Sequence, residues 1–106
     1  MNTLHNIKTI AHRGIHNNID IPENSLLAFK KAKELNIPIE LDIQITKDNR
    51  LIVFHDYSLN RMTNIDKKIK DCTYQELSRI NLLKTNEKIP LLKDVLKLIN
   101  GMEDIK

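Results

Sequence analysis

The sequence predicts an α/β fold, and two patterns indicate it. A short β-branched run near the N-terminus is followed by a helical pattern, and an alternating apolar and polar run comes directly afterwards. Strands that alternate with helices in this order are typical of α/β proteins. The chain has 106 residues, 41% hydrophobic and 29% charged, which suits one small globular domain.

The first strand and helix lie in the N-terminal third. The run "IKTIA", residues 7–11, predicts a strand that stops at "HRG", where Gly14 permits a sharp turn. The stretch "ENSLLAFKKAKELN" predicts a helix, because its apolar residues fall on one stripe and its lysines lie mostly away from it. Asn24 or Ser25 is expected to cap the first turn.

Two further strands are expected to form a hairpin. Apolar and polar residues alternate strictly in "IELDIQI", residues 39–45, and "LIVFHD", residues 51–56, predicts the next strand. The connection "TKDNR" is too short for a parallel crossover, so the two strands should pair antiparallel. If "DN" forms a two-residue turn, Asp42 lies opposite His55 and shares its face, whereas a turn one residue longer shifts this register.

The C-terminal half predicts two helices. In "CTYQEL", Thr73 and Glu76 have the spacing of a capping box, which opens a short helix through Arg79. The stretch "IPLLKDVLKLING" predicts an amphipathic helix that Gly101 ends. The closing "MEDIK" has the pattern of an approach to another strand.

Composition and cysteine usage exclude several classes of function. The net charge is +3 and the pI about 9.0, but the lysines are scattered and aromatic residues make up only 4%, so a solvated surface is favoured over a nucleic-acid footprint. Cys72 is the only cysteine, which excludes an internal disulfide and a cysteine-clustered zinc site. Neither a signal-peptide pattern nor an apolar run of membrane-spanning length is present, so a cytoplasmic location is expected.

Two carboxylates are the strongest local signal for chemistry. Glu40 and Asp42 project from the same side of the predicted strand, with Cα atoms roughly 6.5 to 7 Å apart. At that spacing both can reach one divalent cation through oxygen. The pattern alone equally fits the solvent side of a half-buried sheet.

Two histidines and an arginine follow the ends of strands. His12 and His55 each come after an apolar strand, where α/β folds gather catalytic residues. One such histidine is more often structural, but two at equivalent strand ends favour general acid/base chemistry. Arg13 has a guanidinium suited to phosphate oxygens, and a surface ion pair explains it equally well.

Several motifs, in the correct order, resemble a known family. "AHRG", "PENSLLAFKKA", "IPIELDIQITKD" and "HDYSLNRMTN" closely resemble the start of the glycerophosphodiester phosphodiesterase family, and the match covers essentially the whole chain. Ser25 stands where the family usually has threonine, Asn49 where it has the turn glycine, and Met62 intervenes between Arg61 and Thr63. Serine also caps helices, and asparagine tolerates a positive φ.

The resemblance implies the N-terminal portion of a TIM (β/α)8 barrel with a hairpin excursion after the second strand. Such a barrel needs about 200 to 250 residues, so residues 1–106 would form a partial domain. In a barrel, the apolar face of residues 39–45 would pack outward on helices. The implied activity is hydrolysis of glycerophosphodiesters to sn-glycerol 3-phosphate and an alcohol, a reaction of lipid and glycerol metabolism.

The resemblance also implies roles for five residues. His12 and His55 would be the general acid/base pair, Arg13 would bind the phosphate, and Glu40 and Asp42 would hold Ca²⁺ or Mg²⁺. The family's third metal carboxylate lies on the next strand, past the last residue of this sequence.

Other readings of the sequence remain open. The chain is either part of a phosphodiesterase or a catalytically inactive fragment that acts at most as a cation-binding or association module. We expect self-association through an exposed barrel edge, no nucleic-acid partner and no integral membrane segment. A lipid-cleaving relative of the phospholipase D or phosphatidylinositol-specific type ranks lower, because the "PEN" and "TKD" segments resemble the glycerophosphodiesterase group.

Overall fold

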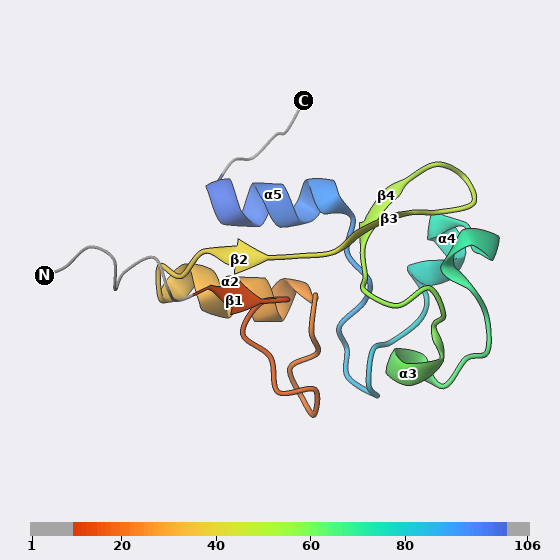
Figure 1. Cartoon of the computed structure of the whole chain (residues 1–106), viewed down its shortest axis with the longest axis horizontal. Coiled ribbons are helices and arrows are strands. Elements are labelled where there is room, and N and C mark those ends of the chain that lie inside the picture. Colours follow the sequence, from red (N-terminus) through yellow and green to blue (C-terminus); the bar gives the residue numbers. More distant parts are fainter. Residues whose placement is uncertain (1–9, 102–106) are drawn as a thin grey trace, which may run out of the picture.

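The computed structural model of the chain describes residues 10–101. Most of the strand expected at residues 7–11 and the closing "MEDIK" lie outside these described residues. Figure 1 shows two parts: the strands β1 and β2 lie beside the helices α2 and α5, and the strands β3 and β4 lie beside the short helices α3 and α4.

The first part is a strand–helix–strand unit. β1 (Ala11–His12) and β2 (Ile39–Glu40) pair in parallel, and α2 (Leu26–Glu34) connects them. In this register His12 is the partner of Glu40. The unit therefore places a histidine and a carboxylate next to each other on neighbouring strands.

The cap of α2 is the serine that the sequence predicts. Ser25 has extended backbone, and its hydroxyl oxygen accepts a hydrogen bond from the backbone N–H of Ala28 at 3.1 Å. The Ser25 hydroxyl also donates to the Pro22 carbonyl at 2.7 Å. The helix thus begins at a fixed point directly after the "PEN" segment.

The second part contains an antiparallel pair of strands, β3 (Ile43–Ile45) and β4 (Leu51–Val53). Ile45 faces Leu51, and the backbone N–H of Thr46 donates to the Arg50 carbonyl at 2.9 Å. Three residues, 47–49, therefore form the turn, and Asn49 adopts a φ of +65° within it.

The expected pairing of Asp42 with His55 is wrong. Asp42 faces Phe54, whose backbone N–H donates to the Asp42 carbonyl at 2.9 Å. The hydroxyl of Thr46 accepts from the backbone N–H of Arg50 at 2.9 Å, which stabilises the longer turn and shifts the pairing by one residue.

The continuous strand expected at residues 39–45 is broken. Its first two residues pair with β1 and its last three with β4, while Leu41 and Asp42 lie in neither strand. Ile39 and Leu41 pack against the helices, but the side chains of Ile43 and Ile45 are about half exposed (51% and 52%). The expectation that this whole apolar face packs on helices is therefore wrong for its second half.

Two hydrophobic clusters support the two parts, and β4 contributes to both. Val53 packs with residues of α2 and α5, whereas its neighbour Ile52 points into the cluster under α3 and α4. This alternation follows from the two faces of a strand. The larger cluster consists of Ile52, Phe54, Leu59, Met62, Ile69, Cys72, Leu77, Leu82 and Ile89.

The two predicted C-terminal helices are present, and the first of them is shorter than predicted. After α3 (Asn60–Thr63) and a 3₁₀ turn (Ile69–Asp71), α4 (Tyr74–Leu77) begins with the predicted capping box but ends before Arg79. α5 (Leu92–Asn100) ends as predicted, with Gly101 in the left-handed conformation.

Within residues 10–101, every helix is too short or too polar to cross a membrane.

Candidate active site

The ends of β1 and β2 bring His12 and Glu40 together. Their parallel register makes them neighbours, and the Nε2 atom of His12 lies 3.7 Å from Oε1 of Glu40. Both side chains are open to solvent, with exposed fractions of 66% and 42%. A molecule in solution can therefore reach both groups.

The backbone of Arg13 is held in a strained conformation directly after β1. Its φ is +59°, which is unfavourable for a residue with a long side chain. The Arg13 N–H donates to the carbonyl and to Oε1 of Glu40, at 2.8 and 3.2 Å, and its carbonyl accepts from the N–H of Asn24 at 2.8 Å. These bonds stabilise the turn and aim the guanidinium back toward the carboxylates.

Asp42 meets the same arginine from the other side. The Nε atom of Arg13 lies 3.5 Å from Oδ2 of Asp42, within ion-pair distance, yet Nε has no hydrogen bond within the described part of the chain. The side-chain amide of Asn24 donates to the same carboxylate oxygen at 3.1 Å. Glu40 and Asp42 thus converge around Arg13 although they lie outside one continuous strand.

Asn24 has a buried oxygen that nothing satisfies among residues 10–101. The residue is only 1% exposed, and its Oδ1 atom has no hydrogen-bond donor there. An orphaned buried oxygen beside Asp42 fits a hard cation, which prefers carboxylate and amide oxygens. In the same described range, however, no three His, Cys, Asp or Glu side chains are grouped closely enough to hold a metal ion by themselves.

Glu23 is a buried carboxylate that accepts a hydrogen bond from Arg13. Its residue is 3% exposed, and its carboxylate accepts from Arg13 at 3.2 Å and from the amide of Asn18 at 2.8 Å. Burial opposes the charged form, but hydrogen bonds from Arg61 and Asn18 outweigh it and lower the pKa of Glu23 to about 2. Glu23 is therefore ionised at neutral pH.

Arg61, on α3, binds two carboxylates at once. It donates to Glu23 at 2.7 and 3.1 Å and to Asp56 at 2.9 and 3.0 Å. Hydrogen bonds from Arg61, opposed by burial and assisted by His55, lower the pKa of Asp56 to about 2. The same contacts raise the pKa of Arg61 well above its ordinary value.

His55 is oriented by the residue that follows it. Its Nδ1 atom lies 2.7 Å from Oδ1 of Asp56, and the amide of Gln44 donates to the carbonyls of residues 54, 55 and 56. Because the Asp56 carboxylate is ionised, it can only accept in this bond, so Nδ1 is the donor, and in the neutral imidazole the lone pair is then on Nε2. The side chain is 43% exposed.

The structure brings four of the five predicted site residues into direct contact. His12, Arg13, Glu40 and Asp42 form one cluster, whereas His55 makes no hydrogen bond to any of them within the described residues. It is joined to Arg13 through Asp56, Arg61 and Glu23.

Sequence reasoning missed four residues of this arrangement: Glu23, Asn24, Asp56 and Arg61. All four stand in motifs that carry the family resemblance, "PEN" and "HDYSLNR". That was the available signal, but hydropathy and spacing give no reason to connect segments so distant in sequence.

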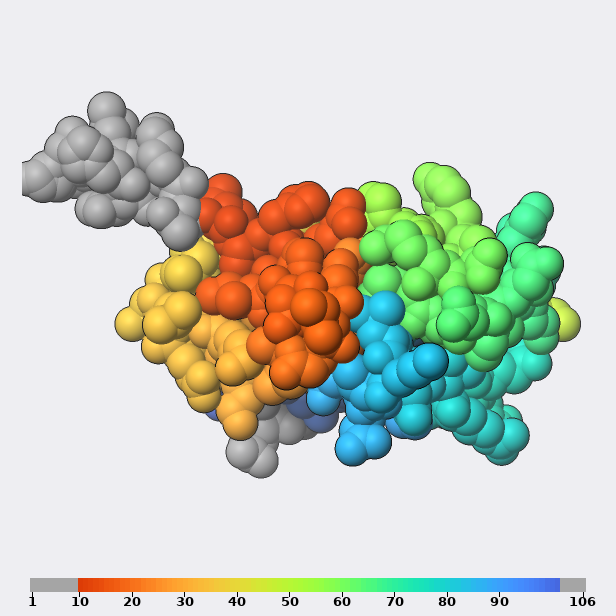
Figure 2. Space-filling view, turned by 90° about the horizontal axis from the view of Figure 1, so that it is seen from below, coloured from red at the N-terminus to blue at the C-terminus, as the bar shows by residue number. Residues whose placement is uncertain are grey.

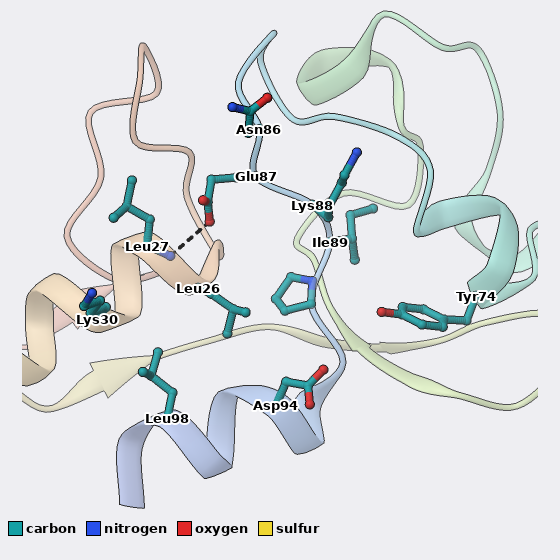
Figure 3. A pocket seen from close by; sticks show the side chains of 11 residues that line it. Leu26, Leu27, Lys30, Tyr74, Asn86, Glu87, Lys88, Ile89, Asp94 and Leu98 are labelled. Carbon is teal, nitrogen blue, oxygen red and sulfur yellow. Dashed lines mark hydrogen bonds between the residues drawn. The ribbon is translucent and has the colours of Figure 1, made fainter. Parts of the chain in front are cut away.

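A separate hollow of about 520 Å³ lies between α2, the segment 86–90 and α5. Figure 3 shows Leu26, Leu98 and Ile89 on its walls, and none of the five predicted site residues lines it. Glu87 on its rim accepts from the backbone N–H of Leu27 at 3.1 Å, so it satisfies the first turn of α2. The hollow is therefore distinct from the histidine and carboxylate cluster.

A family model matches almost the whole described chain. Residues 12–105 match the glycerophosphoryl diester phosphodiesterase family. Similar curated proteins include the glycerophosphodiester phosphodiesterases of Bacillus altitudinis and Caldanaerobacter subterraneus, each 44% identical over 87% and 89% of this chain. The chain spans only about 40% of the length of these relatives.

Solved structures show the same fold relationship. A phosphodiesterase of Oleispira antarctica in complex with the product sn-glycerol-3-phosphate superposes with a TM-score of 0.78 at 30% identity, over 88% of this chain and 40% of that one. A glycerophosphodiester phosphodiesterase of Thermotoga maritima gives 0.71 at 38% identity, over 83% and 37%. The structure thus corresponds to a partial α/β unit of these enzymes.

Proposed function

The chain belongs to the glycerophosphoryl diester phosphodiesterase family, and from this premise we propose that it supplies the histidine and carboxylate part of a site that hydrolyses glycerophosphodiesters to sn-glycerol 3-phosphate and an alcohol. The observation that carries the proposal is the cluster at the strand ends, where His12 lies beside Glu40 and Arg13 lies between Glu40 and Asp42. The cationic Arg13 can stabilise the negative charge of a phosphodiester, and the neighbouring His12 can transfer a proton to or from it.

In this proposal the histidines move protons. His55 presents the lone pair of Nε2, because Nδ1 donates to Asp56, so it can accept a proton from an attacking hydroxyl or water. His12 is the partner that donates a proton to the leaving oxygen. Arg13, whose side chain is 20% exposed, supplies the positive charge that attracts the phosphate oxygens.

Glu40 and Asp42 would hold a divalent cation such as Ca²⁺ or Mg²⁺. Both carboxylates are partly exposed, and the orphaned Oδ1 of Asn24 adds a neutral oxygen beside Asp42. When bound, such a cation neutralises phosphate charge and stabilises the negative charge of the transition state.

The fold proposal follows the same family. We take the chain as the N-terminal part of a (β/α)8 barrel, in which β1, α2, β2 and α5 supply barrel elements and β3 and β4 form an excursion. The parallel pairing of β1 with β2 around α2 supports it, since this is the repeating unit of such barrels.

The test is release of sn-glycerol 3-phosphate from glycerophosphocholine with Mg²⁺ or Ca²⁺ present. We expect His12→Ala and His55→Ala each to lower kcat by about 100-fold or more, because each removes a proton-transfer group. His16→Gln serves as the control, because it removes an imidazole that has no role in the proposed mechanism. Among the described residues the buried Nδ1 of His16 has no hydrogen-bond partner, so the substitution breaks no bond there. Wild-type turnover in both alanine variants would contradict the proposal.

A second candidate function is cation binding without turnover. The observation that favours it is the pair of partly exposed carboxylates, Glu40 and Asp42, with the unsatisfied Oδ1 of Asn24 beside Asp42 among the described residues. Cation binding that needs Glu40 and Asp42, together with no product release from the 106-residue chain, would support this candidate instead.

A further inference from the structure

A continuous row of ionisable side chains links the two halves of the candidate site. It runs from Arg13 through Glu23, Arg61 and Asp56 to His55, and every link measures between 2.7 and 3.2 Å. We call these five residues the charged relay.

The charged relay joins segments that are far apart in sequence. Glu23 precedes α2, whereas Arg61 lies 38 positions later on α3. Figure 2 shows the orange segment around residue 20 beside the green segment around residue 60. The side chains of Glu23 and Arg61 therefore bridge the strand–helix–strand unit and the hairpin part of the molecule.

The hydrogen bonds of Arg61 fix the relative positions of the Glu23 and Asp56 carboxylates. One flat guanidinium gives two hydrogen bonds to Glu23 and two to Asp56. The fork geometry fixes both carboxylates relative to each other, which the point charge of a lysine cannot do. A shift of Glu23 thus displaces Arg61 and, through it, Asp56.

Asp56 in turn determines which tautomer the neutral His55 ring adopts. Its Oδ1 atom accepts from Nδ1 of the imidazole at 2.7 Å and also from Nη2 of Arg61 at 3.0 Å. An ionised acceptor at Nδ1 selects the tautomer in which Nε2 carries the lone pair. That is the form which the proposed function requires of a proton acceptor.

We propose that Glu23, Arg61 and Asp56 are positioning residues that hold His55 in one orientation and one tautomer, and that Glu23 couples this orientation to Arg13. The inference rests on the proposed function for its catalytic meaning, but its structural content stands on the contacts alone. Within residues 10–101 neither Glu23 nor Arg61 makes a hydrogen bond to His55, so the hydrogen-bonded path from either residue to the imidazole runs through Asp56.

The experiment reads the His55 tautomer directly. Two-bond ¹H–¹⁵N spectra of the 106-residue chain, labelled at histidine nitrogens and assigned with His55→Gln, distinguish a proton on Nδ1 from one on Nε2. We expect the wild type to have the proton on Nδ1. Asp56→Asn, Arg61→Gln and Glu23→Gln are each expected to shift population toward the Nε2–H tautomer. Glu23→Gln should give the smallest shift, because two residues, Arg61 and Asp56, lie between Glu23 and His55.

Two further variants make the experiment decisive. Arg61→Lys keeps the charge but loses the fork, so its tautomer population should lie between those of the wild type and Arg61→Gln. Arg79→Gln is the matched control, because the exposed Arg79 side chain makes no hydrogen bond or ion pair within residues 10–101, and it should leave His55 unchanged.

The relay is overturned if Glu23→Gln and Arg61→Gln keep the wild-type backbone amide spectrum and the wild-type tautomer. If either glutamine variant fails to fold, an unchanged tautomer in Arg61→Lys overturns it, and a shifted one supports it. A purely structural role for the relay predicts that stability falls while the His55 tautomer stays the same.

A turnover measurement separates this inference from the proposed function. In the hydrolysis assay, Glu23→Gln should lower kcat by about tenfold or more while KM changes by less than about twofold. If the wild type releases no product, the proposed function fails, yet the tautomer shift still decides the relay.

Discussion

Glu23 lies between two arginines, one from the turn after β1 and one from α3, and only 3% of the residue is exposed. Glu23→Gln keeps the shape of the side chain but leaves both guanidinium groups short of a negative charge. We expect the free energy of unfolding to fall by about 2 kcal/mol, since hydrogen bonds to charged groups contribute about that much.

Urea denaturation measures this loss. Glu34→Gln, at an exposed position on α2, is the matched control and should change the free energy of unfolding by less than about 0.5 kcal/mol. Equal values for the two variants would mean that Glu23 contributes no net stability through its arginines.

The same carboxylates predict an acid-sensitive fold. In the folded chain, the pKa of Glu23 is lowered to about 2 from 4.5, and that of Asp56 to about 2 from 3.8. A lowered pKa stabilises the folded state above the unfolded pKa, and this stabilisation disappears as the pH falls toward the folded value. Unfolding free energy should therefore decline between about pH 5 and pH 2.

Denaturation curves at several pH values check this dependence. The decline should be shallower in Glu23→Gln, because glutamine takes up no proton. Parallel curves for wild type and variant would contradict the lowered pKa of Glu23.

Sequence reasoning could predict single site residues but not their connections. His12 was predictable because it follows an apolar strand, and Glu40 because it shares one face of an alternating run with Asp42. Glu23 and Arg61 were not, since a buried carboxylate in a polar loop and an arginine in a short helix have no hydropathy signal. Only the folded chain shows that they are partners.

At the scale of elements, the turn after β1 determines where α2 lies. Gly14 has a φ of +81°, and a Cβ atom there would lie 2.7 Å from Cβ and 2.9 Å from the carbonyl carbon of Ala28. Gly14→Ala should reduce stability by about 3 kcal/mol, because the left-handed conformation and the overlap with the helix add together.

Gly101→Ala is the control for this substitution. Gly101 also has a positive φ, +67°, but the nearest atom to an added Cβ is the flexible Nζ of Lys33 at 3.5 Å. Its loss should be about 1 kcal/mol, from the backbone alone. Thermal denaturation of both variants compares them, and equal losses would argue against close packing of Gly14 on α2.

The elements themselves were largely predictable, and the hairpin register was not. Ser25, Thr73 and Gly101 end or begin helices as their residue types indicate. The register depended on whether the turn had two or three residues, and hydropathy does not distinguish these. Side-chain bonds of Thr46 decided it in favour of the longer turn.

At the scale of the whole molecule, two hydrophobic clusters meet at β4 and the charged relay spans the parts that they support. The apolar side chains of Ile43, Ile45 and Leu51 are left about half exposed. The alternation in sequence predicted an apolar face here, but it could not show how much of that face the chain itself covers.

The central proposal is that Glu40 and Asp42 hold a divalent cation in the same site in which the imidazoles of His12 and His55 transfer protons. Paramagnetic broadening by Mn²⁺ in NMR spectra of the ¹⁵N-labelled chain tests it most directly. We predict that substoichiometric Mn²⁺ broadens the signals of His12, Arg13, Asn24 and His55 first, and that Asp42→Asn abolishes the effect. Broadening that centres on another part of the chain, or that persists in both Glu40→Gln and Asp42→Asn, would contradict the claim.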